Sequence, residues 1–186
     1  MDDAQMRAEL EQLHAASYGW ALSCCDRDAA LAEDVLQTAY LKVLQGRARY
    51  GGQSAFKTWL FAVIRHTAAD ERRRHWLRRL KLVAYGREHA EAVNPAVAAG
   101  RLEQSERRQM FRQALAALPH RQQQVLHLVF YQDLTVQQAA EVMGVSIGSA
   151  RTHYERGKQK LRQWWKNAEV QNEHGFTRQQ SPATLS

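Results

Sequence analysis

The sequence predicts an all-α protein made of two small helical domains joined by a linker. Apolar residues recur at helical spacing through most of the chain, and no run alternates over the length of a strand. The three prolines and ten glycines fall mostly between the periodic segments. A chain of 186 residues is long enough for one ordinary domain or two small ones, and too short for a large enzyme core.

The N-terminal domain is predicted over residues 1–81. Three helices are expected in it, from Gln5 to about Cys25, from near Asp28 to Leu44, and from near Ser54 to the arginine cluster at 72–74. The segment 46–54 contains three glycines and is predicted to be a loop, because they cannot all belong to a stable helix. On the third helix, Trp59 falls on the apolar face and is expected to be a core residue.

The helical pattern fades after this domain and then resumes. Residues 82–104 are rich in small residues and contain one Asn-Pro pair, so they are predicted to be a linker. The C-terminal domain is predicted over residues 105–166, with Pro119 at the start of a helix, where proline is best tolerated. The polar tail, 167–186, is predicted to be disordered.

The C-terminal domain contains the most informative pattern, a helix-turn-helix. Thr135 is a good N-cap with Gln138 three residues later, which is the capping-box spacing. Gly144 follows where the chain must reverse, often at positive φ, and Ser146 is able to cap the next helix. A helix-turn-helix places its second helix in the major groove of DNA, so the sequence predicts DNA binding.

The outer face of that second helix is polar, whereas its inner face repeats apolar and small residues at helical spacing. Arg151 is the best candidate for a bidentate guanine contact, and Glu155 is able to accept a hydrogen bond from a cytosine amino group. Contacts to phosphates are expected from Arg121, Arg156 and Lys158. The alternative is that any one of these residues is simply exposed. The full predicted set is Arg121, Ser149, Arg151, Thr152, Glu155, Arg156 and Lys158.

Charge is distributed unevenly along a chain whose net charge is +7 and whose pI is about 9.7. Residues 1–46 contain eight acids and three bases, whereas residues 65–81 contain seven bases and two acids. A basic segment suits an anionic partner, and the acidic one suits a different partner. The acidic segment is therefore not expected to be the part that binds DNA.

Four stretches in this order resemble the extracytoplasmic-function (ECF) sigma factors of bacterial RNA polymerase, within the sigma-70 family. They are AEDVLQTAYLKVL (32–44), SAFKTWLFAVIRHTAADERRR (54–74), ALPHRQQQVLHL (117–128) and the helix-turn-helix. The resemblance implies a sigma factor that binds core polymerase through the coiled coil of the largest subunit and the flap region. It also implies that the first domain captures the −10 promoter element as it opens and that the second recognises the −35 element as duplex.

The resemblance implies site residues for the first domain as well. On the helix 32–44, the polymerase-binding residues are expected to be Asp34, Gln37, Thr38, Tyr40 and Lys42. The residues expected to bind −10 DNA are Arg47, Tyr50, Arg65, His66, Arg72, Arg73 and Arg74. For each set, the alternative to a binding role is that these side chains form an ordinary solvated helix face. His153 and Tyr154 depart from residues common in relatives, and this departure can alter which −35 sequence is recognised.

Two competing interpretations remain. One is a stand-alone helix-turn-helix regulator, which does not explain the second basic segment. The other is an enzyme, for which only the pair His66 and Asp70 has metal-ligand spacing and no nucleotide-binding or zinc motif is present. We expect no catalysis, metal or cofactor, no membrane insertion, and a cytoplasmic location with Cys24 and Cys25 reduced. An anti-sigma factor remains a possible further partner.

Overall fold

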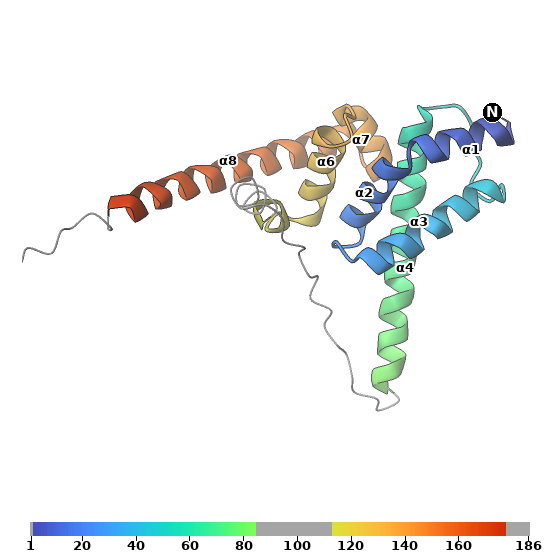
Figure 1. The fold of residues 1–186 in the computed structure, drawn as a ribbon, viewed down its shortest axis with the longest axis horizontal. Coiled ribbons are helices and arrows are strands. Elements are labelled where there is room, and N and C mark those ends of the chain that lie inside the picture. The colour runs from blue at the N-terminus through green and yellow to red at the C-terminus, as the bar shows by residue number, and fades with distance from the viewer. Residues whose placement is uncertain (1, 85–112, 178–186) are drawn as a thin grey trace, which may run out of the picture.

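The computed structural model describes residues 2–84 and 113–177, with side chains described except at 75, 79–84 and 167–177. All regular elements in these two ranges are α-helices, which confirms the predicted fold class. The N-terminal module has four helices, and the C-terminal module has three, preceded in the described range by a helical turn at 113–116 (Figure 1). None of the described helices is both long enough and apolar enough to cross a membrane.

The N-terminal module begins with two helices where one was predicted. Helix α1 (Asp3–Gln12) ends at Leu13, whose backbone angles leave helical geometry, and α2 (His14–Cys24) follows directly. The prediction of one continuous helix was wrong because periodicity persists across a break of a single residue. The break lets α1 contact α3 while α2 packs against both α3 and α4.

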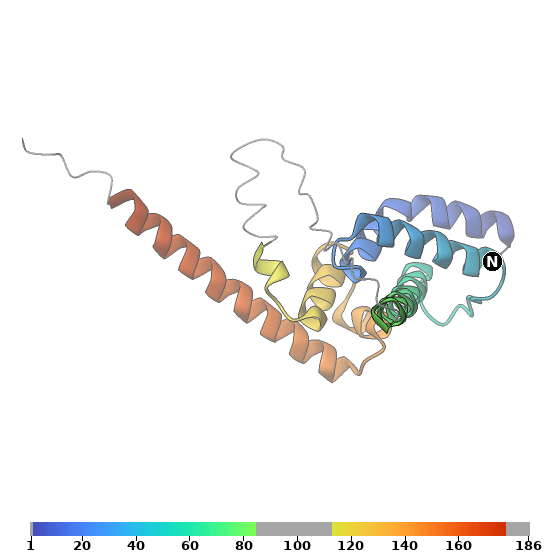
Figure 2. The ribbon, with the colours of Figure 1, turned by 90° about the horizontal axis from the view of Figure 1, so that it is seen from below.

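Helices α3 (Ala29–Leu44) and α4 (Phe56–Ala84) complete this module. Asp28 caps α3 by accepting a hydrogen bond from the backbone N–H of Leu31 at 3.0 Å. Helix α4 extends well beyond the arginine cluster and is the long helix seen end-on in Figure 2. The predicted linker therefore begins within a helix at residues 82–84, and residues 85–104 lie outside the described range.

The C-terminal module contains α6 (His120–Phe130), α7 (Val136–Met143) and α8 (Ile147–Thr177). Pro119 is the N-cap of α6 and begins that helix as predicted. Helix α8 has 31 residues, so at 1.5 Å per residue it is about 46 Å long. It projects far from the rest of the molecule (Figures 1 and 2). Residues 167–177 were expected to be disordered, but they are helical and belong to α8. The rest of the predicted tail, 178–186, lies outside the described residues.

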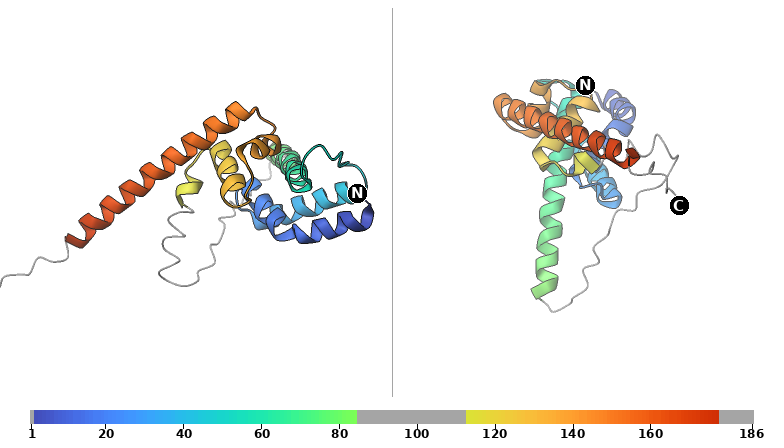
Figure 3. Two further views of the ribbon diagram at one scale, coloured as in Figure 1. Left: turned by 90° about the horizontal axis from the view of Figure 1, so that it is seen from above. Right: turned by 90° about the vertical axis from the view of Figure 1, so that its left-hand side faces the viewer.

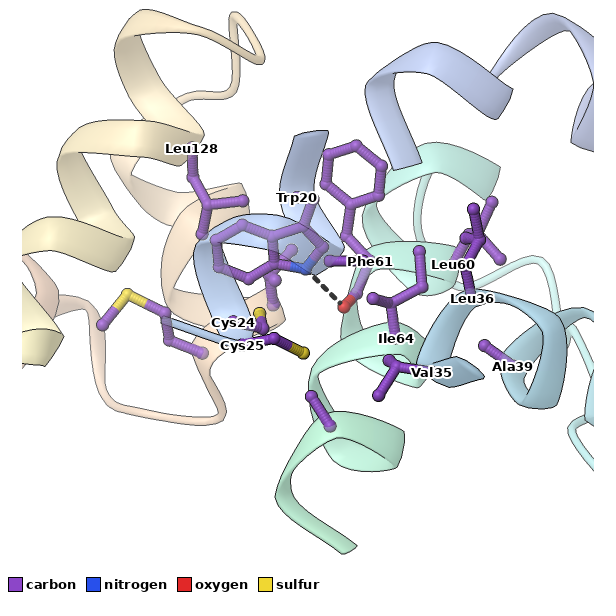
Figure 4. Close-up of a cluster of buried hydrophobic side chains, with 14 of the residues drawn as sticks. Trp20, Cys24, Cys25, Val35, Leu36, Ala39, Leu60, Phe61, Ile64 and Leu128 are labelled. Atoms are coloured by element: carbon purple, nitrogen blue, oxygen red, sulfur yellow. Dashed lines mark hydrogen bonds between the residues drawn. The ribbon is translucent and has the colours of Figure 1, made fainter. Parts of the chain in front are cut away.

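The two modules share one continuous cluster of buried apolar side chains. Figure 4 shows Trp20 of α2 at its centre, between α4 and the C-terminal module. The Trp20 indole is fully buried, donates a hydrogen bond to the Phe61 carbonyl at 2.9 Å and stacks on the Phe61 ring. A buried indole N–H needs such an acceptor, because an unpaired donor inside a protein is costly. Trp20 thus fixes α2 on α4.

Direct contacts join the modules side by side. Helix α7 packs against α4 and α6 packs against α2. The left view of Figure 3 shows α7 beside α4. Cys24 and Cys25 are free and buried close to this junction. Burial raises the pKa of Cys25 to about 11 and that of Cys24 further, so both thiols stay protonated at neutral pH.

Candidate nucleic-acid interface

The helix-turn-helix forms as the sequence predicts, because each of its signals is local. Thr135 and Gln138 make the reciprocal capping box at the start of α7. Gly144 ends that helix in the left-handed region at φ 61°, which glycine adopts at no steric cost. The Ser146 hydroxyl then accepts the backbone N–H of Ser149 at 3.1 Å and caps α8.

The outer face of α8 is open to solvent. Ala150 and Gly157 are buried against the rest of the module, which fixes the rotation of the helix about its axis. This rotation leaves five of the predicted −35 residues exposed on the outer side of α8: Ser149, Arg151, Thr152, Glu155 and Arg156. Exposed donors and acceptors on a helix start are what recognition of base edges in the major groove requires.

Several of the predicted −35 residues also make contacts within the protein, among them the Thr152 hydroxyl, which donates to the Gly148 carbonyl at 3.0 Å. Lys158 is half-buried, with Nζ 3.2 Å from the Glu155 carboxylate and 4.6 Å from the centroid of the Tyr154 ring. Arg121 is exposed at the first turn of α6 and donates to the Met143 carbonyl at 3.4 Å. A cation at this carbonyl also suits the negative end of α7. Arg121 therefore contributes to the junction between helices as well as to the surface.

The predicted −10 cations on α4 do not form one continuous track. His66 and Arg73 are exposed, seven positions apart on the same side of the helix. Arg74 donates to the Glu71 carboxylate at 2.7 Å, so part of its charge is already neutralised. Arg65 and Arg72 are only half-exposed and lie on the side of α4 that bears Phe61, toward the C-terminal module.

Arg65 lies at the junction between modules. Its guanidinium is within 3.7 Å of where a side chain on Gly144 would begin, at the end of α7. Desolvation lowers its pKa, and the positive charges of Arg121 and Arg72 lower it further. The group stays charged because an arginine pKa remains far above neutrality. In this arrangement Arg65 faces protein on one side and is not freely presented to DNA.

The loop before α4 folds back on an aromatic group. The Tyr50 hydroxyl donates to the Ser54 carbonyl at 2.6 Å, and its ring centroid lies 5.3 Å from those of Phe56 and Trp59. Trp59 packs against the core, as expected from its place on the apolar face. Arg47 is exposed at the other end of the loop. Tyr50 is half-buried, so only part of its ring remains available for stacking.

The residues of α3 that are predicted to bind polymerase differ in how far their side chains are exposed. Asp34 and Gln37 are exposed, and Thr38 is half-exposed. Tyr40 instead donates to the Leu10 carbonyl at 3.3 Å, which ties α1 to α3. Lys42 donates to Thr67 Oγ1 at 3.0 Å and lies 3.8 Å from the Asp70 carboxylate, which ties α3 to α4.

Two large apolar residues on the same face are exposed. Leu41 is 54% exposed and Leu44 is 45% exposed, although the other large apolar side chains of α3 are buried or half-buried. Asp34, Gln37, Leu41 and Leu44 together define what we call the α3 face. Exposed leucines among polar residues are typical of an interface for another helix. Leu41 lies outside the apolar face that helical spacing predicts for this helix. Leu44 was expected to be one of its inner residues, and that prediction is wrong, because Leu44 is the last residue of α3 and its side chain is exposed.

The described residues contain no group of three or more His, Cys, Asp and Glu side chains that is able to hold a metal ion. Of the pair at metal-ligand spacing, His66 is exposed and the Asp70 carboxylate lies 3.8 Å from Lys42 Nζ.

These features define a helical DNA-binding protein with two modules, one bearing a helix-turn-helix and the other a cationic helix beside the exposed α3 face. Comparison with known families gives the same division. Residues 10–78 match sigma-70 region 2, and residues 114–163 match sigma-70 region 4. The chain belongs to the sigma-70 family of RNA polymerase sigma factors and is similar to its ECF members.

Individual relatives agree with this assignment. The RNA polymerase sigma factor CarQ of Myxococcus xanthus is 32% identical over 139 residues, which cover 74% of this chain and 76% of that protein. A probable RNA polymerase sigma factor, RfaY of Xanthomonas campestris, is 28% identical over 177 residues, covering 86% of this chain but only 44% of the longer relative. The stand-alone regulator is therefore not favoured.

A solved structure has the same fold. The sigma factor RpoE of Bartonella quintana, in complex with the anti-sigma factor NepR, superimposes with a TM-score of 0.66. The match covers 87% of this chain and 97% of that one, at 22% sequence identity. At this identity the likeness supports the fold only.

Proposed function

We propose that this chain directs core RNA polymerase to specific promoters, with three separate surfaces for three tasks. The α3 face binds core polymerase, the outer face of α8 binds the −35 element, and the exposed cations of α4 bind the −10 element as its strands separate. The role places the chain in the cytoplasm. Phosphodiester chemistry belongs to the polymerase, and this chain contributes binding energy alone.

The observation that best supports this proposal is the exposure of the α3 face. A self-sufficient DNA-binding protein has no need of leucines at 54% and 45% exposure beside an exposed carboxylate and amide. An apolar centre with a polar rim is typical of a protein–protein interface. A helix of the partner that offers cations and apolar side chains fits this surface, as a coiled coil of the polymerase would.

Promoter recognition follows from the other two surfaces. The guanidinium of Arg151 is free for a bidentate contact with guanine O6 and N7. On α4, His66 and Arg73 provide exposed donors for the backbone of a single strand. An anti-sigma factor is a further expected partner, because the similar Bartonella fold is found with one.

The test is co-elution of the chain with purified core RNA polymerase on size exclusion. The double variant Asp34→Ala/Gln37→Ala is expected to lower the affinity at least tenfold, and Leu41→Ala is expected to do the same. A matched control is Glu11→Ala/Gln12→Ala, which also removes one acid and one amide, from the exposed side of α1. Tight specific binding to duplex DNA without any binding to core polymerase would contradict the proposal.

A further inference from the structure

The first turn of α8 presents an isoleucine to solvent. Ile147 is 40% exposed, whereas Val145, two positions earlier, packs against the core cluster. A single exposed apolar side chain is common on protein surfaces. The position of Ile147 distinguishes it, because it is the first residue of α8, and the N-terminal residues of a recognition helix contact base edges.

The orientation of Ile147 is fixed by the cap of the helix and by the shape of its own side chain. Ser146 Oγ accepts the backbone N–H of Ser149 at 3.1 Å and lies 2.9 Å from Ser149 Oγ, so the first turn is held in place. An isoleucine in a helix has one strongly preferred χ1 rotamer. Side chains in a helix also tilt toward its N-terminus, so Ile147 extends toward the leading end of α8.

Ile147 lies beside the best candidate for a base contact. Arg151 is four positions later, which is one helical turn and about 6 Å along the axis. Gly148, between them on the helix surface, adds no side chain, and a Cβ there would meet Ser146 Oγ at 4.0 Å in otherwise open space. The bare backbone at Gly148 lets the start of α8 come close to the base edges.

The side chain of Ile147 determines which base it suits. Among the groups that base pairs present in the major groove, the C5-methyl group of thymine is apolar, and the others are hydrogen-bond donors or acceptors. An isoleucine placed against a donor or acceptor removes its water without replacing the hydrogen bond, which is unfavourable. Against the methyl group of thymine, two apolar surfaces leave water together, which is favourable.

We propose that Ile147 selects thymine in the −35 element by contacting its C5-methyl group. The thymine lies one or two base pairs from the base that Arg151 contacts, because base pairs stack about 3.4 Å apart and the two residues are separated by about 6 Å. The inference rests on the proposed −35 role of α8 and adds to it a residue outside the predicted set. It predicts discrimination between thymine and uracil, which differ by this methyl group alone.

The experiment uses the full chain assembled with core RNA polymerase and a pool of promoter duplexes randomised over the −35 region. Sequencing of the bound fraction is expected to show a selected thymine one or two base pairs from a selected guanine. Ile147→Ala is expected to lose the preference for thymine at that position alone. Val136→Ala is the matched control, because Val136 is the β-branched first residue of α7, and it should keep the wild-type preferences. Circular dichroism verifies that each variant is folded.

The second measurement compares the affinity for the selected duplex with that for the same duplex carrying uracil in place of the thymine. The wild type and Val136→Ala should bind the uracil duplex about fourfold more weakly, the effect of losing one buried methyl group. Ile147→Ala should bind both duplexes with nearly equal affinity, because it lacks the surface that the methyl group contacts. Ile147→Val should show an intermediate difference. The four affinities of wild type and Ile147→Ala form a double-mutant cycle between protein and DNA.

An equal loss on uracil substitution in the wild type and in Ile147→Ala would overturn the inference, because another group would then contact the methyl. So would a wild-type selection without thymine within two base pairs of the selected guanine. Weaker co-elution of Ile147→Ala with core polymerase would also overturn it and would assign Ile147 to a protein interface. If the wild type binds core polymerase and selects a −35 sequence, any of these results rejects the thymine contact and retains the proposed function. A pool without any selected sequence would reject both.

Discussion

Gly157 controls how closely α8 approaches α6, and its replacement by alanine tests the packing that orients the recognition helix. A Cβ at this position would lie 2.9 Å from Leu126 Cδ1 and 3.4 Å from Gln122 Cβ. Leu126 is only 1% exposed and is itself enclosed by the core, so its side chain has little room to move. The added methyl group must therefore displace α8 or force Leu126 from its preferred rotamer.

The magnitude combines two opposing effects. Overpacking of a core by one methyl group typically costs about 1–3 kcal/mol. Alanine in place of glycine within a helix returns up to about 1 kcal/mol of helix propensity. We therefore expect Gly157→Ala to lower the free energy of unfolding by up to about 2 kcal/mol, the difference between the two effects.

The assay is equilibrium urea unfolding followed by circular dichroism. The matched control is Gly148→Ala in the first turn of α8, where the only neighbouring atom is Ser146 Oγ at 4.0 Å. That change is expected to be neutral or to stabilise by up to about 1 kcal/mol. In a double-mutant cycle, Leu126→Ala should cost less in the Gly157→Ala background, because the new methyl group fills part of the void. Equal stability of both glycine variants, with additive effects in the cycle, would refute this account.

Three further predictions follow from single contacts. Burial, with a smaller contribution from the charge of Arg27, lowers the pKa of His127 to about 4. Because unfolded chains bind this proton near pH 6.5, the free energy of unfolding should fall by up to about 3 kcal/mol between pH 6.5 and 4. A denaturant series should show this loss in the wild type and a smaller one in His127→Gln. Thr135→Ala should cost about 1 kcal/mol in urea unfolding, because it removes the cap of α7. In footprinting on −35 variants, Arg151→Ala should lose discrimination at one base pair, whereas Arg156→Ala should weaken binding evenly; equal losses at all positions for both would contradict this assignment.

The helix-turn-helix could be predicted from the sequence because its determinants are local. Thr135, Gln138, Gly144 and Ser146 act on backbone groups within three or four positions, and each makes the expected contact or conformation. The burial of Ala150 and Gly157 then follows from helical periodicity. Nothing outside the segment is needed to derive the exposed recognition face.

Residues at the edges of helix faces could not be placed in this way. Tyr40 and Lys42 lie near the boundary between the inner and outer sides of α3, and whether such a side chain is buried depends on which other helix packs beside it. Tyr40 bonds to Leu10 of α1 and Lys42 bonds to Thr67 of α4, and both partners are distant in the sequence. The same reason explains Arg65, whose exposure depends on how the second module docks.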